Sequence, residues 1–241
     1  MATWVIGDIH GCKAELDQAL RLMDLSDQDH LISVGDLLDR GPDSVGVVRT
    51  LRSLNCRFTL VMGNHESKHA RFRKGNPVKD AHGELRAITN GLNAHDVRFL
   101  ESAVLATQVV EDGQTYTIVH AGIPSYTRSL PLGLNDANSI KNHKWLTMVR
   151  YQTPEGTPVG LGSETETDKF WTETYDGRFG TVVYGHQPHL NFGTPVVHNS
   201  TIGIDLGCCF GGYLCAIRLG DHKTVTVKAE RQYSRPHGAE E

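Results

Sequence analysis

Short apolar runs alternate with amphipathic stretches in the first sixty residues. Residues 3–6, 31–34 and 57–62 are rich in β-branched and other apolar side chains, which is typical of buried strands. Between them, apolar residues recur every three or four positions, as they do on one face of a helix: Leu16, Leu20 and Met23, then Val47, Val48, Leu51 and Leu54. This βαβαβ order predicts a largely parallel sheet with right-handed crossovers.

The second half of the chain has more predicted strands and longer loops. Residues 107–111 and 115–119 flank Asp112-Gly113, a strong signal of a hairpin turn. Residues 67–101 are polar and helical in tendency, and further strands are predicted over 179–184, 201–205, 213–219 and 224–228. Residues 125–168 are predicted to form long surface loops around one helix near 145–150. We expect a single domain over 1–233 and a flexible tail over 234–241.

Each of the first three predicted strands runs into a polar motif flanked by glycine. The motifs are Gly7-Asp8-Ile9-His10-Gly11, Gly35-Asp36-Leu37-Leu38-Asp39-Arg40-Gly41 and Gly63-Asn64-His65-Glu66. Two later strands run into His120-Ala121-Gly122 and Gly185-His186. Because the carboxyl ends of parallel strands lie at one edge of a sheet, we expect the ligand loops of the parallel sheet to meet there.

The residue types in these motifs suit a pair of metal ions. Carboxylate, imidazole and amide groups bind hard or borderline divalent cations, and a bridging carboxylate holds two of them roughly 3.5–4 Å apart. Asp8 and His10 can face one ion, Asp36 can bridge, and Asn64, His120 and His186 can complete the second site. The expected cofactors are two divalent ions, with Mn²⁺ first and Fe, Zn, Co or Ni as alternatives. Such a pair of ions cleaves phosphate esters.

The order and spacing of these motifs from residue 7 to residue 186 resemble the phosphoprotein phosphatase superfamily, the calcineurin-like metallophosphoesterases. The resemblance implies an α/β fold in which a central mixed β-sandwich is flanked by helices, with a dimetal site at the carboxyl ends of strands. It also implies that Asp8, His10 and Asp36 bind the first metal, and that Asp36, Asn64, His120 and His186 bind the second. A water or hydroxide that bridges the ions is then the nucleophile.

The same resemblance gives roles to the remaining motif residues. Arg40 resembles the family's phosphate clamp, and His65 resembles the proton donor to the leaving group, oriented by Asp39. Family members use a second arginine, for which Arg150 is the candidate and Arg178 the reserve. The alternative for Arg150 is an ordinary surface arginine. His189 is left out of the ligand set because the superfamily pattern does not use it.

A second motif overlaps the third glycine-flanked block. His65-Glu66-Ser67-Lys68-His69 satisfies H-E-x-x-H, the pattern of zinc peptidases. That pattern needs both histidines on an established helix with the glutamate as general base, whereas here a helix only starts at His65. A zinc peptidase is therefore a remote alternative. We expect His69 to face solvent and Glu66 to cap or orient rather than to bind metal.

Composition excludes several classes of protein. The chain has 241 residues with 24 basic and 28 acidic side chains, and a formal charge of −4 gives no overall attraction to duplex nucleic acid. The apolar runs are too short to span a membrane, so no membrane association is expected. Five cysteines without a C-x-x-C pair, and only three residues before the apolar segment Trp4-Val5-Ile6, predict no disulfide framework and no secretory signal. These features predict a cytoplasmic protein.

Local motifs give a narrower prediction of the substrate. Eukaryotic protein phosphatases carry Leu-Arg before the Gly-Asn-His-Glu motif, where this chain has Val61-Met62. The run from Gly63 to His82-Gly83 and the segment Ile204-Asp205-Leu206-Gly207-Cys208 resemble bacterial Ser/Thr phosphatases and symmetrical diadenosine tetraphosphatases. The sequence therefore predicts a dinucleoside-polyphosphate hydrolase, with a Ser/Thr protein phosphatase as the alternative and a non-catalytic phosphate-binding module as a remote one. The expected partner is a phosphorylated small molecule or a phosphoprotein substrate.

Overall fold

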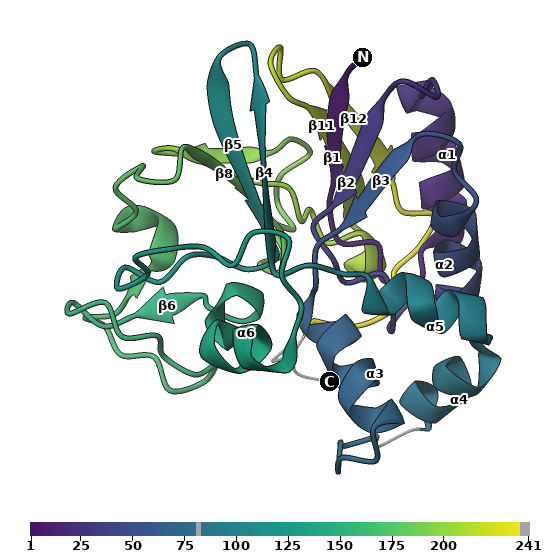
Figure 1. The fold of residues 1–241 in the computed structure, drawn as a ribbon, viewed down its shortest axis with the longest axis horizontal. Helices are drawn as coiled ribbons and strands as arrows, with labels where there is room; N and C mark the ends of the chain where they lie inside the picture. Colours follow the sequence, from purple (N-terminus) through teal and green to yellow (C-terminus); the bar gives the residue numbers. More distant parts are fainter. Residues whose placement is uncertain (81–82, 237–241) are drawn as a thin grey trace.

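Two five-stranded mixed β-sheets pack face to face in this computed structural model, which describes residues 1–80 and 83–236 (Figure 1). The strand order of the first sheet is β12 (Thr224–Lys228), β11 (Tyr213–Arg218), β1 (Thr3–Ile6), β2 (His30–Ser33) and β3 (Arg57–Leu60). The order of the second is β4 (Ala106–Glu111), β5 (Gln114–Val119), β8 (Thr181–Tyr184), β10 (Thr201–Gly203) and β9 (Val196–His198). His82 and residues 237–241 of the expected tail lie outside the described residues.

Each sheet contains three parallel strands. In the first sheet β1 pairs with β2 and β2 with β3, and in the second sheet β5 pairs with β8 and β8 with β10, all in parallel. The remaining strands pair antiparallel at the flanks. Parallel strands bring their carboxyl ends to one edge of a sheet, so each sheet presents three such ends.

Alternate side chains of both sheets form the layer between them. Val5 and Ile32 from the first sheet and Ile118 and Val183 from the second belong to one buried cluster. Their neighbours Trp4, Ile6 and Leu31 point to the opposite face, where they pack in a second, larger cluster with the helices. This alternation follows from the two-residue period of a strand and explains why the strands are apolar on both faces.

Helices cover the outer face of the first sheet, as Figure 1 shows for α1 (Lys13–Met23) and α2 (Ser44–Arg52). Their buried faces carry the residues that the sequence pattern predicted, including Leu16, Met23, Val47 and Leu51. Three further helices, α3 (Asn64–Arg73), α4 (Glu84–Gly91) and α5 (Ala94–Glu101), follow β3. The predicted metallophosphatase-like α/β architecture, a mixed β-sandwich flanked by helices, is confirmed.

The segment 125–168 differs in detail from its prediction. Its regular helix is α6 (Ala137–Asn142), and a 3-10 turn η1 (Lys144–Thr147) follows, so the helix expected near 145–150 was misplaced. Asp136 explains the earlier start, because its side chain accepts hydrogen bonds from the backbone N–H groups of Asn138 and Ser139. The chain then enters a two-stranded sheet of β6 (Tyr151–Gln152) and β7 (Lys169–Phe170), followed by the turn η2 (Trp171–Glu173).

The Asp112-Gly113 turn forms as predicted. Glu111 pairs with Gln114, and the two turn residues have φ angles of 49° and 77°, as a tight hairpin requires. All five cysteines are unpaired. Within residues 1–80 and 83–236, no helix is long and apolar enough to cross a membrane.

We expect the layer between the sheets to carry much of the stability. Ile118 is fully buried there, so Ile118→Ala should lower the free energy of unfolding by about 2–5 kcal/mol. The matched control is Val110→Ala on the neighbouring strand, where the side chain is 68% exposed and the change should stay within about 0.5 kcal/mol. Urea unfolding measures both values, and equal losses in the two variants would contradict this account of the core.

Candidate metal centre

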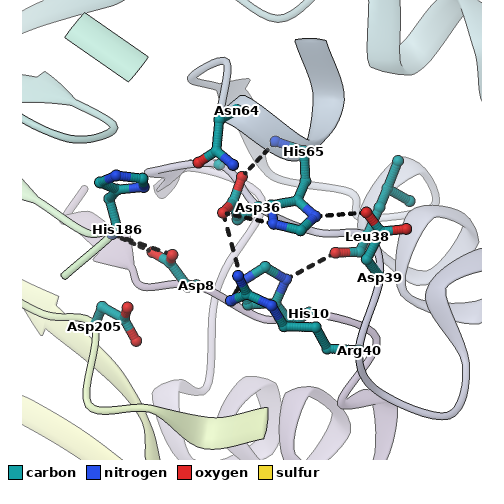
Figure 2. A network of polar contacts seen from close by, with 12 residues as sticks. Asp8, His10, Asp36, Leu38, Asp39, Arg40, Asn64, His65, His186 and Asp205 are labelled. Carbon is teal, nitrogen blue, oxygen red and sulfur yellow. Dashed lines mark hydrogen bonds and ion pairs between the residues drawn. The ribbon is translucent and has the colours of Figure 1, made fainter. Parts of the chain in front are cut away.

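The six predicted metal ligands lie together where parallel strands of the two sheets end. Asp8 and His10 follow β1, Asp36 follows β2, Asn64 follows β3, His120 follows β5 and His186 follows β8. Figure 2 shows most of them around one centre. The sixth parallel strand, β10, is followed by Asp205, which is 5% exposed and lies next to Asp8 in Figure 2. The sequence analysis quoted Asp205 only within a motif, although it follows a strand as the candidate ligands do.

Asp36 lies at the middle of the cluster. Its Oδ2 atom is 3.5 Å from His10 Nε2, 3.4 Å from His120 Nε2 and 3.9 Å from His65 Nε2. Two groups with metal-ligating geometry share this carboxylate: His10, Asp36 and His65 form one, and Asp36, His120 and His186 form the other. In each group the donor atoms lie within 4.8 Å of one another. A carboxylate common to two groups is the arrangement that a bridging ligand needs.

Backbone carbonyls orient two of the imidazole rings. His10 Nδ1 donates to the carbonyl of Leu38 at 2.8 Å, and His120 Nδ1 donates to the carbonyl of Val34 at 2.9 Å. Each ring therefore presents its Nε2 atom to Asp36. This use of the outer nitrogen is typical of histidines that bind metal ions in proteins.

Several carboxyl groups are buried together at this edge. Burial raises the pKa of Asp8 well above its usual value, and the charge of Asp205 adds to the effect. Burial also raises the pKa of Asp205 to about 6. Asp36 differs, because the charges of His120 and His65 outweigh its burial and hold its pKa well below the usual range. The oxygen and imidazole donors, together with this buried negative charge, fit two divalent cations.

Asp8 lies outside the two groups that share Asp36. Both of its carboxylate oxygens accept a hydrogen bond from the backbone N–H of His186, at 3.2 and 3.1 Å, and His65 lies beside His10 and Asp36. Asp205 and Asp36 both repel the charge on Asp8. That repulsion disfavours the charged form of Asp8 and is one cause of its raised pKa.

Glu66 links the second and third motifs. Its carboxylate accepts hydrogen bonds from the backbone N–H groups of Asp36 and Leu37, both at 2.8 Å, and of Gly63 at 3.0 Å. Glu66 therefore orients the loop after β2, in agreement with the expectation. A glutamate held by three N–H groups is also unsuited to act as the general base of a peptidase, even though α3 carries both histidines of the H-E-x-x-H pattern.

His65 belongs to a hydrogen-bonded chain that includes a residue the sequence analysis misplaced. His65 Nδ1 lies 2.5 Å from Asp39 Oδ2, and Asp39 also accepts hydrogen bonds from Lys68 Nζ and His69 Nε2, both at 2.8 Å. The expectation that His69 faces solvent is wrong, since its side chain is fully buried. On α3, His69 lies four residues after His65, so both rings are on one face of the helix and reach the same carboxylate.

The candidate arginines differ in position. Arg40 Nη1 donates to His10 Nε2 at 2.7 Å, and Arg150 Nη2 donates to the carbonyl of His186 at 2.9 Å. Arg150 Nε is buried and has no hydrogen-bond partner among the described residues. Arg178 instead pairs with Asp176 at 2.7 Å and donates to the carbonyl of Thr127. The structure thus brings Arg150, and not Arg178, to the cluster.

His189 lies outside both metal-ligating groups. Its ring packs against the rings of Tyr184 and Phe192, with centroids 6.4 and 6.1 Å away. Its backbone N–H donates to the carbonyl of Asp205 at 2.9 Å. His189 therefore supports the loop after β8.

Backbone strain is concentrated at this edge. Five residues of the motifs have left-handed backbone conformations that non-glycine residues rarely adopt, with φ angles of 47° to 71°: His10, Asp36, Asp39, Arg40 and His186. Conformations of this kind cost about 1–3 kcal/mol each and occur mainly at functional sites, where surrounding contacts hold them in place.

Two motif glycines give the carboxylates room. A Cβ atom on Gly63 would lie 2.1 Å from Asp36 Oδ1, and one on Gly185 would lie 2.0 Å from Asp8 Oδ1. Any side chain at these positions collides with a candidate ligand. The motifs carry glycine there because the carboxylates approach the backbone closely.

Comparisons with known proteins agree with this geometry. A family model described as calcineurin-like phosphoesterase matches residues 1–228. A protein of Bacillus velezensis named bis(5'-nucleosyl)-tetraphosphatase PrpE (asymmetrical) is 31% identical over 97% of this chain and 95% of its own length. A protein of Erwinia tasmaniensis named bis(5'-nucleosyl)-tetraphosphatase, symmetrical, is 29% identical over 96% of this chain and 99% of its own.

A solved structure has the same fold over nearly the whole chain. It is the crystal structure of a protein provisionally called a diadenosine tetraphosphatase, with a TM-score of 0.73 and 26% identity over 95% of this chain and 93% of that one. The family of the matching model uses a dimetal site, which is what the two groups sharing Asp36 provide for. The sequence motifs, the two sheets and these similarities establish that the chain belongs to the calcineurin-like phosphoesterase family.

Proposed function

We propose that this protein hydrolyses dinucleoside polyphosphates at a dimetal centre formed by Asp8, His10, Asp36, Asn64, His120 and His186. The observation that carries the proposal is the shared carboxylate of Asp36 between two groups of buried imidazoles. The names of the relatives, which are tetraphosphatases of both the symmetrical and the asymmetrical type, support the choice of substrate. We also propose that residues 1–233 act as one domain, in the reducing environment that five unpaired cysteines suit.

Two divalent cations at this centre supply the positive charge that stabilises the transition state and lowers the pKa of the attacking water. We propose Mn²⁺ as the ion, with Fe, Zn, Co or Ni as alternatives, since a donor set that mixes oxygen with imidazole nitrogen admits all of them. Asp8, His10 and Asp36 would hold one ion, and Asp36, Asn64, His120 and His186 would hold the other.

Arg40 and Arg150 bind the phosphate groups in this proposal. Arg40 donates to His10, and Arg150 donates to the carbonyl of His186. The two guanidinium groups therefore approach the cluster from different segments of the chain. The buried Nε of Arg150, which lacks a partner among the described residues, is a donor that a phosphate oxygen would satisfy. Their positive charge then neutralises the non-bridging oxygens as the bond breaks.

His65 gives a proton to the leaving oxygen. Its Nδ1 atom is held by Asp39, so its Nε2 atom faces the cluster, 3.9 Å from Asp36. Lys68 and His69 hold Asp39 in turn, which makes them positioning residues. Burial opposes the charge on Asp39, but hydrogen bonds from His65 and His69 keep the pKa of Asp39 well below its ordinary value.

The roles of Asp36 and His65 can be separated by metal content. Asp36→Asn should lose bound Mn²⁺ from both positions, because it removes the shared charge. His65→Asn should keep the metal and slow hydrolysis by about 10²–10⁴-fold, most for leaving groups that need protonation. Elemental analysis after dialysis, combined with kcat for alkyl and aryl phosphates, measures both effects. Equal metal loss in the two variants would make His65 a ligand instead of the acid.

His69→Phe removes one hydrogen bond to Asp39 while keeping a planar side chain. We expect kcat to fall about 10- to 100-fold with little change in KM. The pKa of Asp39 should rise toward its ordinary value, as carboxyl NMR titration measures. In the wild-type protein the depressed pKa of Asp39 stabilises the fold at pH values above about 3.9, the pKa of an aspartate in the unfolded chain. The difference in free energy of unfolding between the wild-type protein and His69→Phe should therefore shrink as the pH falls below that value.

The matched control for this change is His198→Phe, because His198 is exposed on β9. It should alter neither kcat nor the titration of Asp39. His69→Gln retains a donor and should recover part of the rate. If the pKa of Asp39 in His69→Phe stayed as low as in the wild-type protein, His69 would not position Asp39.

The substrate is tested by supplying Mn²⁺ to protein stripped with a chelator. We expect the stripped protein to be inactive and the restored protein to cleave diadenosine tetraphosphate with higher kcat/KM than a phosphothreonine peptide or an aryl phosphate. Chromatography of the products separates symmetrical cleavage, giving two ADP, from asymmetrical cleavage, giving ATP and AMP. A preference for the peptide would favour the Ser/Thr phosphatase alternative, and no turnover with any divalent ion would contradict the enzymatic proposal.

A further inference from the structure

A cavity of about 230 Å³ opens beside the candidate metal centre. Its lining includes Arg40, Arg150, Tyr151, Leu161, Gln187 and Phe210. It adjoins the centre directly, since Arg40 bonds to His10, Arg150 bonds to the carbonyl of His186, and Gln187 is the next residue in the chain. The volume is below the roughly 300–1,000 Å³ of pockets that enclose a whole drug-sized ligand, so it suits one part of a larger substrate.

Aromatic side chains share the cavity lining with the two guanidinium groups. The Cζ atom of Arg40 lies 5.1 Å from the ring centroid of Phe210, and Arg150 is followed directly by Tyr151. The ring of Tyr151 is fixed by an edge contact with Phe170, with centroids 5.7 Å apart. Leu161 adds an apolar side chain that is 66% exposed. The cavity therefore joins anion-binding groups to flat apolar surface.

The local backbone directs Phe210 toward this cavity. Phe210 ends the short turn η3 (Cys208–Phe210), which lies between Gly207 and Gly211, both with left-handed backbones at φ 69° and 86°. Cys208 and Cys209 are buried beneath the turn, whereas Phe210 stays half-exposed. The two cysteines are therefore part of the core, whereas the phenyl ring packs against the core and also contributes to the cavity lining.

We propose that this cavity binds the nucleobase adjacent to the cleaved phosphate, an assignment that rests on the proposed function. The base stacks on Phe210 and Tyr151, while the side-chain amide of Gln187, which is both donor and acceptor, meets its polar edge. Arg40 and Arg150 hold the phosphates of the same nucleotide. A planar base carried on a phosphate chain matches both parts of the lining, whereas a phosphoserine or phosphothreonine side chain brings no planar group.

Binding of two ligands that differ only in the base tests the proposal without turnover. Calorimetry in Mn²⁺ compares AMP with ribose 5-phosphate. We expect the wild-type protein to bind AMP at least roughly fivefold more tightly, since stacking on one aromatic side chain is worth that much. Phe210→Leu, which keeps apolar bulk without a ring, should abolish this preference, and Phe210→Tyr should retain it.

The matched control is Phe192→Leu, because Phe192 carries a ring that is 49% exposed and lies outside the cavity lining. It should keep the wild-type preference for AMP. In turnover, Phe210→Leu should lower kcat/KM for diadenosine tetraphosphate relative to glycerol phosphate by a similar factor.

The outcomes separate this inference from the proposed function. Equal binding of AMP and ribose 5-phosphate by the wild-type protein would overturn the nucleobase site even if diadenosine tetraphosphate is cleaved. A preference for AMP that disappears in Phe210→Leu would support the site, and absence of turnover would then count against the proposed function alone. If Phe210→Leu reduced cleavage of a phosphothreonine peptide and left AMP binding intact, the occupant would be a peptide and the proposal would be wrong.

Discussion

The carboxylate of Asp36 is the point on which the rest of the site depends. A buried charge needs partners from every side, and Asp36 has them: Oδ1 accepts the backbone N–H of His65 at the start of α3, and Oδ2 faces imidazoles from both sheets. Its own backbone N–H is held by Glu66. Because these partners come from different elements, the carboxylate is in place only when the two sheets pack correctly.

This dependence explains the fold's arrangement of strands. Each sheet supplies three parallel strand ends, and the apolar layer that includes Val5, Ile32, Ile118 and Val183 sets their relative position. Hydrogen bonds then cross between the sheets at the same edge, from His120 to the carbonyl of Val34 and from the N–H of His186 to Asp8. Packing of the core thereby holds the strained, charged loops close together.

Periodicity predicted the strands and helices that build the first sheet, because apolar spacing is a local property of the sequence. The glycine-flanked motifs predicted which candidate ligands lie together for the same reason, since each motif directly follows a strand. What local signals missed depends on tertiary contacts. His69 is a polar residue in a polar helix, where an exposed side chain is expected. It is buried because its ring donates to Asp39. The sequence offered Arg150 and Arg178 as candidates but not their contacts: Arg150 donates to the carbonyl of His186, whereas Arg178 donates to that of Thr127.

The contrast between local signals and tertiary contacts also applies to the residues proposed for catalysis and those proposed for substrate preference. The groups proposed to act on phosphorus would be needed for every phosphate substrate, and they lie in short motifs that are visible in the sequence. The cavity beside them is assembled from segments that begin at Arg40, Arg150, Gln187 and Phe210, which are far apart in the chain. No periodic pattern or motif marks such a combination. A substrate preference built in this way is readable only once the fold has brought the aromatic rings next to the arginines.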